Sequence, residues 1–272
     1  MDSLRLAPPV PATPSTAPGS SRLLERDFTL GEVAGVLWSR RPEPTRPPAL
    51  VLMGHGGGLH KKTHELVARA HHYVSAWGFT VVAIDAPGHG DRPRTARDDQ
   101  ARADLRAAMA LGDTARVEAV TVDYGISLAD RAVPEWQAVV DALLHAPELS
   151  GLFGPDDDTP VGYGGGITLG TAVGIPLTAA EPRIKAAIFG GGFVVHDGLL
   201  EAARRITVPV QFLLPWDDEH VDRESALGLF DAFASAEKTL HANPGDHRTI
   251  TWHGLDQGFL ARHLRRDVEA LP

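Results

Sequence analysis

The hydrophobic pattern of the chain alternates between two periods. Short, nearly continuous apolar runs are typical of buried parallel strands, whereas apolar residues repeated every three or four positions predict amphipathic helices. The predicted strands are 49–53, 79–84, 160–165, 184–189, 208–214 and 238–242. The predicted helices are 64–77, 94–108, 133–144, 171–180, 225–234 and about 258–270. This alternation favours an α/β fold with a mostly parallel sheet and helices on both faces.

Three stretches depart from this alternation. Residues 26–38 carry loosely alternating apolar residues around Gly31, which predicts a β-hairpin. Residues 93–145 are too long for a simple crossover, so we expect a helical insertion that partly covers the functional site. Residues 1–22 are rich in proline and alanine and lack the apolar core of a signal peptide. We expect them to be a disordered tail, and residues 23–272 to form a single domain.

Composition narrows the class of protein. The 272 residues, 43% of them hydrophobic, suffice for one large soluble domain. A net charge of −9 argues against a nucleic-acid partner, and no apolar run approaches the ~20 residues of a membrane helix. The sequence has no cysteine, and no His, Asp or Glu cluster has convincing metal-ligand spacing. We expect a cytoplasmic protein without metal or cofactor, for which a homodimer is compatible with the sequence.

The chain is organised around Gly166-Ile167-Thr168-Leu169-Gly170, which reads G-x-T-x-G between a predicted strand and a predicted helix. In this context G-x-S-x-G forms a nucleophile elbow, whose central residue sits on a strained turn with its side-chain oxygen exposed. We expect both flanking glycines to be required because a Cβ atom would clash with the neighbouring strand and helix. The alternative is that Thr168 only caps the following helix.

Three reactive side chains follow predicted strands. Thr168, Asp218 and His247 each come just after one, and ligands of open α/β sheets bind outside the carboxyl ends of the strands. A hydroxyl, an imidazole and a carboxylate can act as nucleophile, general base and orienting group. His241, inside the last predicted strand, is the weaker candidate for the base, and Asp217 competes with Asp218 for the acid.

Five motifs occur at strand ends in a fixed order. They are His-Gly-Gly-Gly at 55–58, Asp-Ala-Pro-Gly-His-Gly at 85–90, the G-x-T-x-G at 166–170, Trp-Asp-Asp-Glu-His-Val at 216–221 and Asn-Pro-Gly-Asp-His at 243–247. Together they resemble the α/β-hydrolase superfamily, nearest to its dienelactone hydrolase and acyl-esterase branch, over about residues 26–270. The order nucleophile, acid, histidine is also that of α/β-hydrolases. The resemblance implies an eight-stranded sheet and acyl transfer through a nucleophile–His–acid triad.

The resemblance also selects between local alternatives. Gly164 is a second candidate for the nucleophile position, but Thr168 has the family's spacing to Pro182, the proline before the next strand. The family places the acid three residues before a valine, here Val221, which favours Asp218 over its neighbour. The family's serine is therefore replaced by a threonine.

Backbone donors for an oxyanion are expected near the nucleophile. Glycines after a strand allow close approach to substrate, so we assign Gly57 and Gly58, together with the N–H of Leu169, the residue after the nucleophile. The candidate substrate contacts are His55, Trp216 and Tyr124. For Trp216, core packing is an equally good interpretation, and for Tyr124 a place on the helix surface is a better one.

Two functions follow from the threonine. Its hydroxyl can attack a carbonyl, but its methyl group stiffens χ1 in a strained turn and is expected to slow the reaction. The first hypothesis is a hydrolase that cleaves a carboxylic ester, lactone or related small acyl substrate with Thr168, His247 and Asp218. The alternative is a non-hydrolytic protein of the same fold, a binding module or a biosynthetic catalyst that uses the pocket and His247.

Overall fold

A ten-stranded sheet forms the centre of the protein. The computed structural model describes residues 3–12, 23–40, 49–153, 159–166, 168–191 and 194–265. The strands are β1 (Leu4–Leu6), β2 (Val10–Pro11), β3 (Leu23–Leu30), β4 (Val33–Arg40), β5 (Leu50–Met53), β6 (Thr80–Ile84), β7 (Val161–Gly164), β8 (Ile184–Gly190), β9 (Val210–Pro215) and β10 (Lys238–Asn243). The helices are α1 (His64–Trp77), α2 (Ala96–Leu111), α3 (Thr114–Leu144), α4 (Leu169–Ala180), α5 (Asp197–Ala203), α6 (Arg223–Ala232) and α7 (Phe259–Leu264).

Strands β3 to β10 form the eight-stranded part of the sheet that the resemblance implied. Their spatial order is β3-β4-β6-β5-β7-β8-β9-β10, and every pair from β6 to β10 is parallel. The predicted hairpin is confirmed, since β3 and β4 pair antiparallel around Gly31. A parallel sheet brings the carboxyl ends of its strands to one edge, where the loops after β5 to β10 meet.

The N-terminal stretch corrects the prediction of a disordered tail at 1–22. In its described part, Leu4–Leu6 pairs antiparallel with β3, and Val10–Pro11 also pairs with β3. These two short strands raise the sheet from the expected eight strands to ten. The proline-rich composition concealed them because short edge strands tolerate proline where no ladder donor is needed. Residues 13–22 lie outside the described residues.

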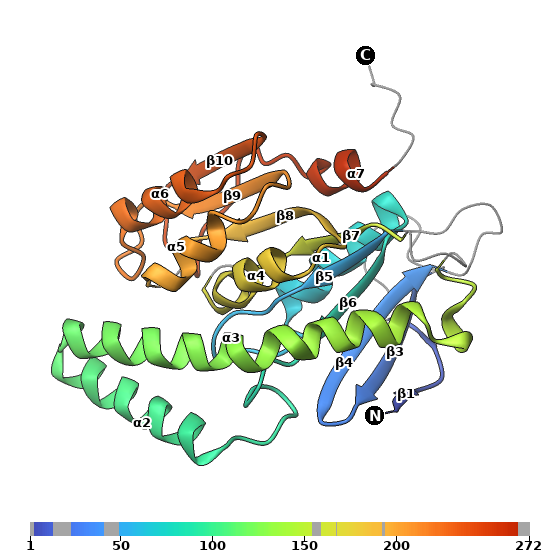
Figure 1. The fold of residues 1–272 in the computed structure, drawn as a ribbon, viewed down its shortest axis with the longest axis horizontal. Coiled ribbons are helices and arrows are strands. Elements are labelled where there is room, and N and C mark those ends of the chain that lie inside the picture. The colour runs from blue at the N-terminus through green and yellow to red at the C-terminus, as the bar shows by residue number, and fades with distance from the viewer. Residues whose placement is uncertain are drawn as a thin grey trace.

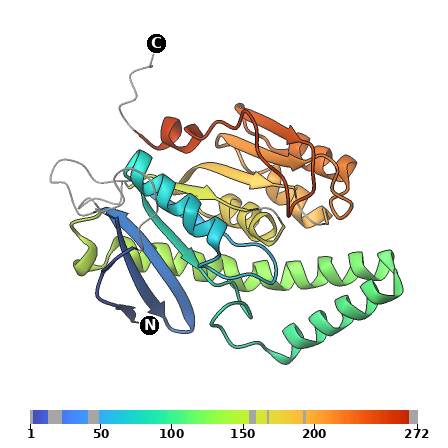
Figure 2. The ribbon, with the colours of Figure 1, turned by 180° about the vertical axis from the view of Figure 1, so that it is seen from behind.

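Helices cover both faces of the sheet (Figures 1 and 2). Along β5, Leu50 and Leu52 belong to the core beneath α3 to α6, whereas Val51 and Met53 belong to the core beneath α1 and α7. This is the period-two alternation of a strand that is buried on both faces, and it explains why the sequence shows a continuous apolar run. The sheet beneath the carboxyl edge is therefore packed on both faces.

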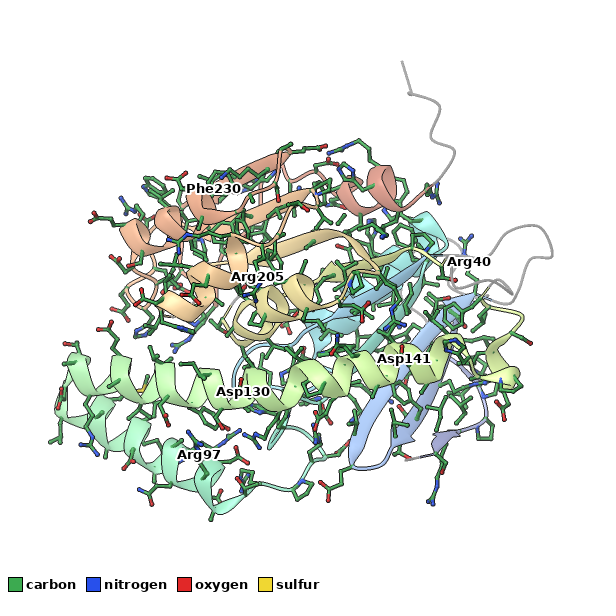
Figure 3. All side chains as sticks on the ribbon, viewed as in Figure 1. Arg40, Arg97, Asp130, Asp141, Arg205 and Phe230 are labelled. Atoms are coloured by element: carbon green, nitrogen blue, oxygen red, sulfur yellow. The ribbon has the colours of Figure 1, made fainter. Side chains whose placement is uncertain are left out.

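The predicted insertion contains a pair of helices that we call the arm, defined as α2 together with residues 114–127 of α3. A capping box between Thr95 and Asp98 starts α2, and α2 packs on α3. Figures 1 and 2 show the connection between the two helices projecting beyond the rest of the chain. Arg97, labelled in Figure 3, lies on α2 and pairs with Asp123 of α3.

Helix α3 corrects the predicted start of a helix at 133. It runs without interruption from Thr114 to Leu144, with Pro134 inside it. A proline removes one hydrogen bond to the carbonyl four residues earlier, here that of Asp130. Both residues are exposed, and Asp130 is labelled on α3 in Figure 3. Water can therefore satisfy the freed carbonyl, which allows the helix to continue.

Candidate active site

The turn between β7 and α4 has the backbone strain of a nucleophile elbow. Thr168 has φ 65° and ψ −114°, and it is the one non-glycine residue with positive φ in the described part of the chain. A β-branched residue rarely adopts this conformation, which occurs mainly where function requires it. The competing position, Gly164, is the last residue of β7 and lies within the sheet. Thr168 also has no side-chain capping hydrogen bond to α4, which argues against the interpretation as a simple cap.

The glycines of the elbow correct one expectation. A Cβ atom on Gly166 would meet the Gly54 carbonyl at 3.6 Å, and one on Gly170 would meet the His55 carbonyl at 3.5 Å. Both distances are ordinary van der Waals contacts, so neither glycine is required by the clash that the sequence suggested. The crowded glycines are instead those around Tyr163, where a Cβ atom on Gly174 would lie 2.1 Å from the tyrosine ring.

The loop after β5 reaches the candidate nucleophile. The backbone N–H of Gly57 donates to Thr168 Oγ1 over 3.4 Å. Gly57 and Gly58 are exposed, and a Cβ atom on either would meet nothing within 4 Å, so the space above them is open. Leu169 is the first residue of α4, a position whose N–H has no acceptor within the helix. Of the three predicted oxyanion donors, the N–H of Gly57 contacts the Thr168 hydroxyl, and the roles of Gly58 and Leu169 stay predictions.

The candidate acid and base form a tight pair. Asp218 follows β9 and His247 follows β10, and His247 Nδ1 lies 2.6 Å from Asp218 Oδ2. The same carboxylate accepts the backbone N–H of His247 at 2.6 Å and that of His220 at 2.9 Å. Burial alone would raise the pKa of Asp218, but these hydrogen bonds and the imidazole lower it overall. An ionised Asp218 therefore orients the ring and fixes which nitrogen faces it.

The competing residues have other partners. Asp217 accepts the backbone N–H of Gly245 and holds the loop after β10 against the loop after β9. His241 lies within β10, and its Nε2 is 3.3 Å from the amide of Gln211. Neither contact reaches the pair formed by Asp218 and His247.

The first residue after β8 connects the elbow with the loop after β9, which carries Asp218. The carbonyl of Gly191 accepts the N–H of Thr168 at 3.3 Å. On its other side, a Cβ atom on Gly191 would lie 3.0 Å from the Val221 side chain, three residues after Asp218. Gly191 thus lies between the elbow and the loop that carries Asp218, and a larger residue there would crowd the Val221 side chain.

The three predicted substrate contacts lie in different surroundings. His55 is buried; its Nδ1 lies 2.8 Å from the Gly56 carbonyl and its Nε2 accepts the N–H of Ala86 at 3.0 Å. Burial lowers the pKa of His55, which keeps the ring neutral and able to accept. Its contacts favour a role in holding the Gly56–Gly58 loop. Its contact with substrate stays a prediction.

Trp216 does not pack in the core. Its side chain is 38% exposed, and the guanidinium of Arg223 lies 4.1 Å above its ring. Tyr124 is half-buried, and its charged neighbours are Asp98, Arg102 and Arg131 at the base of the arm. Burial raises the pKa of Tyr124. Substrate binding by either residue stays a prediction.

The sequence missed a buried ionic cluster behind the loop after β5. Asp85, at the end of β6, accepts the backbone N–H of Lys61 at 2.8 Å and its ammonium at 2.6 Å. Lys61 is buried and also contacts Asp91 at 2.6 Å. The signal was the aspartate placed directly after a buried strand. Within the described ranges, no three His, Asp or Glu side chains gather to hold a metal, and no helix has the length and apolar character to span a bilayer.

Solved structures of hydrolases resemble the chain along most of its length. A cold-adapted esterase from an Arctic intertidal metagenomic library has 30% sequence identity and a TM-score of 0.65, over 90% of this chain and 95% of the esterase. Dienelactone hydrolase from Anabaena variabilis has 20% identity and a TM-score of 0.56, over 88% and 96% of the two chains. Acetyl xylan esterase from Paenibacillus sp. R4 has 12% identity and a TM-score of 0.55, over 92% and 85%.

Neither a protein-family model nor a curated protein sequence matches the chain. The structural relatives nevertheless define its class: the chain belongs to the α/β-hydrolase superfamily. It is an α/β-hydrolase enzyme whose relatives are ester hydrolases, and its fold is shared with dienelactone hydrolase.

Proposed function

We propose that this protein cleaves carboxylic esters, lactones or related small acyl substrates through Thr168, His247 and Asp218. The observation that carries the proposal is the strained turn at Thr168, whose hydroxyl accepts the N–H of Gly57. Strain of this kind persists at functional sites, where the surrounding structure over-determines it. The carboxylate–imidazole pair of Asp218 and His247 adds the matching base and its orienting group.

The residues support a two-step acyl transfer. His247 takes the proton of Thr168 Oγ1 as the oxygen attacks the substrate carbonyl, and the N–H groups of Gly57, Gly58 and Leu169 bind the oxyanion. The imidazolium then returns the proton to the leaving alcohol, which departs and leaves an ester on Thr168. Water, deprotonated by His247, attacks this ester, and the acid leaves as Thr168 regains its proton.

The threonine methyl group limits the rate. Thr168 is β-branched and has few side-chain rotamers in this strained turn, so we expect its methyl group to restrict the position from which Oγ1 attacks. A tenfold loss corresponds to about 1.4 kcal/mol of transition-state free energy. We therefore expect Thr168→Ser to raise kcat for a p-nitrophenyl ester by roughly ten- to a hundredfold.

A set of four variants tests the proposal with p-nitrophenyl acetate and butyrate. Thr168→Ala and His247→Ala should abolish turnover, whereas His241→Ala, a histidine outside the pair, should retain it. If neither the native protein nor Thr168→Ser hydrolyses any acyl ester, the proposal fails. If Thr168→Ala keeps a native function that His247→Ala loses, the protein is instead a non-hydrolytic catalyst or binding module. The cytoplasmic location, the homodimer and the exclusion of nucleic acid stay predictions from the sequence.

A further inference from the structure

The strained backbone conformation of Thr168 requires stabilising contacts from neighbouring residues. A β-branched residue at φ 65° relaxes to ordinary backbone unless its neighbours fix the chain on both sides. The nucleophile hydroxyl must also stay within reach of its base and its oxyanion donors, because small misplacements are costly in catalysis. The residues that fix the turn therefore influence the reaction without touching the substrate.

One of these residues is Thr171, which is fully buried in the first turn of α4. Its Oγ1 lies 2.7 Å from the Gly190 carbonyl and 3.0 Å from the Gly166 carbonyl, and it accepts the N–H of Gly190 at 3.0 Å. A hydroxyl has one proton and two lone pairs, so this group can accept from Gly190 while its proton is shared between the two carbonyls. It ties the first glycine of the elbow to the end of β8.

The same contact acts on Thr168 from the other side. The Gly191 carbonyl, next to Gly190, accepts the Thr168 N–H at 3.3 Å. Thr171 thus fixes both the residue two positions before Thr168 and the strand end that receives the backbone of Thr168. A helical threonine usually returns its hydroxyl to a carbonyl of its own helix. Thr171 instead contacts carbonyls that both lie outside α4.

A second hydroxyl fixes the turn from below. Tyr163 is fully buried in β7 and donates to the Gly170 carbonyl over 2.5 Å. Its ring fills the space left by three glycines, since a Cβ atom on Gly54, Gly165 or Gly174 would lie 2.1–2.4 Å from the tyrosine. The ring is packed against these glycines, and its hydroxyl contacts the carbonyl of the second glycine of the elbow.

We propose that Thr171 is a positioning residue of the active site, which holds Thr168 in its strained conformation through its hydroxyl, with Tyr163 as a second support. The expected effect on kcat rests on the proposed hydrolytic function. The effect of Thr171 on the conformation of the elbow does not, because it follows from the hydrogen bonds of Thr171 alone. Thr171 touches neither the substrate nor the reacting atoms and acts through the backbone of the elbow.

Helix α4 offers a matched control. Thr178 is also buried on α4, but its hydroxyl has no hydrogen-bond partner among the described residues. Thr171→Val and Thr178→Val make the same change of a hydroxyl to a methyl group, seven positions apart on one helix. Thr171→Ser keeps the hydroxyl and removes only the methyl group. All three are compared with the native protein by kcat and KM for p-nitrophenyl butyrate, and by hydrogen–deuterium exchange of the peptide that spans the elbow.

Thr171→Val should lower kcat roughly ten- to a hundredfold with KM changed less than about twofold, and should speed amide exchange at the elbow. Thr171→Ser should recover most of both properties, and Thr178→Val should match the native protein. Native kcat and exchange in Thr171→Val, or equal losses in Thr178→Val, would overturn the inference.

Two safeguards keep the test decisive. If Thr171→Val does not fold, Tyr163→Phe decides, since it removes one hydroxyl and keeps the ring; it should lower kcat and speed exchange at the elbow, and native values would overturn the inference. If the native protein and Thr168→Ser hydrolyse no ester, the proposed function has failed. The positioning inference is then judged by exchange alone, where an elbow of native protection in Thr171→Val overturns it.

Discussion

The carboxyl edge of the sheet and the arm are built in opposite ways. At the edge, buried polar side chains connect separate segments: Asp85 holds the loop after β5, Thr171 holds the elbow and Asp218 holds His247. In the arm, α2 buries only Asp98 and Ala108, and α3 buries none of its described residues before Leu128. The edge depends on long-range hydrogen bonds, whereas the arm consists of local helical structure attached at one end.

The base of the arm marks the boundary between the two regions. Asp98 is fully buried and accepts two hydrogen bonds from Arg131, while its carboxylate also caps α2 through Thr95. Burial would raise the pKa of Asp98, but Arg131 and Thr95 hold it far below its usual range. The same side chain fills the space beside Gly88, in the loop after β6. Side chains of this protein are thus held in place by long-range contacts where charged groups are buried between loops, and such contacts end where the charged groups become exposed.

The largest expected effect is in the acid pair. Asp218→Asn keeps the size of the side chain but removes the charge that orients His247, so we expect kcat for a p-nitrophenyl ester to fall by about 10⁴-fold. Asp217→Asn is the matched control, because the Asp217 carboxylate accepts the backbone N–H of Gly245. It should lose less than about tenfold. Equal losses in the two variants would contradict the assignment of the acid.

The next effect is on the stability that the ionic cluster behind the loop after β5 provides. Asp85→Asn leaves the buried ammonium of Lys61 without its main counter-charge, so we expect the free energy of unfolding to fall by about 3 kcal/mol. Asp91→Asn removes the other partner of the same lysine, but the Asp91 side chain is 79% exposed. Its loss should stay below about 1 kcal/mol. Urea unfolding measures the loss of stability in both variants. A larger loss in Asp91→Asn than in Asp85→Asn would show that burial does not determine how much each ion pair stabilises the protein.

A buried histidine next to this cluster predicts a pH dependence. Burial lowers the pKa of His89 to about 4, in a setting that includes the ring of His55 and the charges of Arg102 and Asp98. The unfolded chain takes up a proton on this residue below about pH 6.5, whereas the folded chain does so only near pH 4. Stability therefore falls as the pH decreases through this window, by about 2 kcal/mol between pH 7 and pH 5.

The measurement is the free energy of urea unfolding at pH 7 and at pH 5. His89→Asn keeps a donor for the Pro87 carbonyl and removes the titrating ring, so it should lose less stability between the two pH values than the native protein. His72→Asn, on the exposed side of α1, is the control and should behave as the native protein. An unchanged pH slope in His89→Asn would assign the effect to other groups.

The success of the sequence-based predictions follows the same division between local and long-range structure. Strands β3 to β10 and the elbow were predictable because apolar runs and turn glycines are local signals. The pairing of Leu4–Leu6 with β3 and the continuation of α3 through Pro134 were not, because each depends on neighbours that the local pattern does not contain.

For the candidate site, the sequence identified residue types but not their contacts. Asp218 and His247 were predicted as partners, and His247 Nδ1 lies 2.6 Å from Asp218 Oδ2. No motif in the sequence predicted that Lys61 is buried against Asp85. A lysine in a loop is usually exposed, because burying its charge costs free energy. Here the carboxylate of Asp85, 24 positions away along the chain, compensates the buried ammonium, and this contact is not visible in the local sequence.

The smallest expected effect tests the arm itself. Leu111, at the end of α2, is 80% exposed, so Leu111→Ser should change the free energy of unfolding by no more than about 0.5 kcal/mol. Leu143→Ala, on the buried end of α3, removes a fully buried side chain and should cost about 2–5 kcal/mol. Urea unfolding and sedimentation velocity together check the pair. A loss above about 1 kcal/mol for Leu111→Ser, or a smaller sedimenting species, would mean that another copy of the chain covers this end of the arm. In that case the arm would be exposed only in the single chain, and its contrast with the hydrogen-bonded carboxyl edge of the sheet would not apply to the assembled protein.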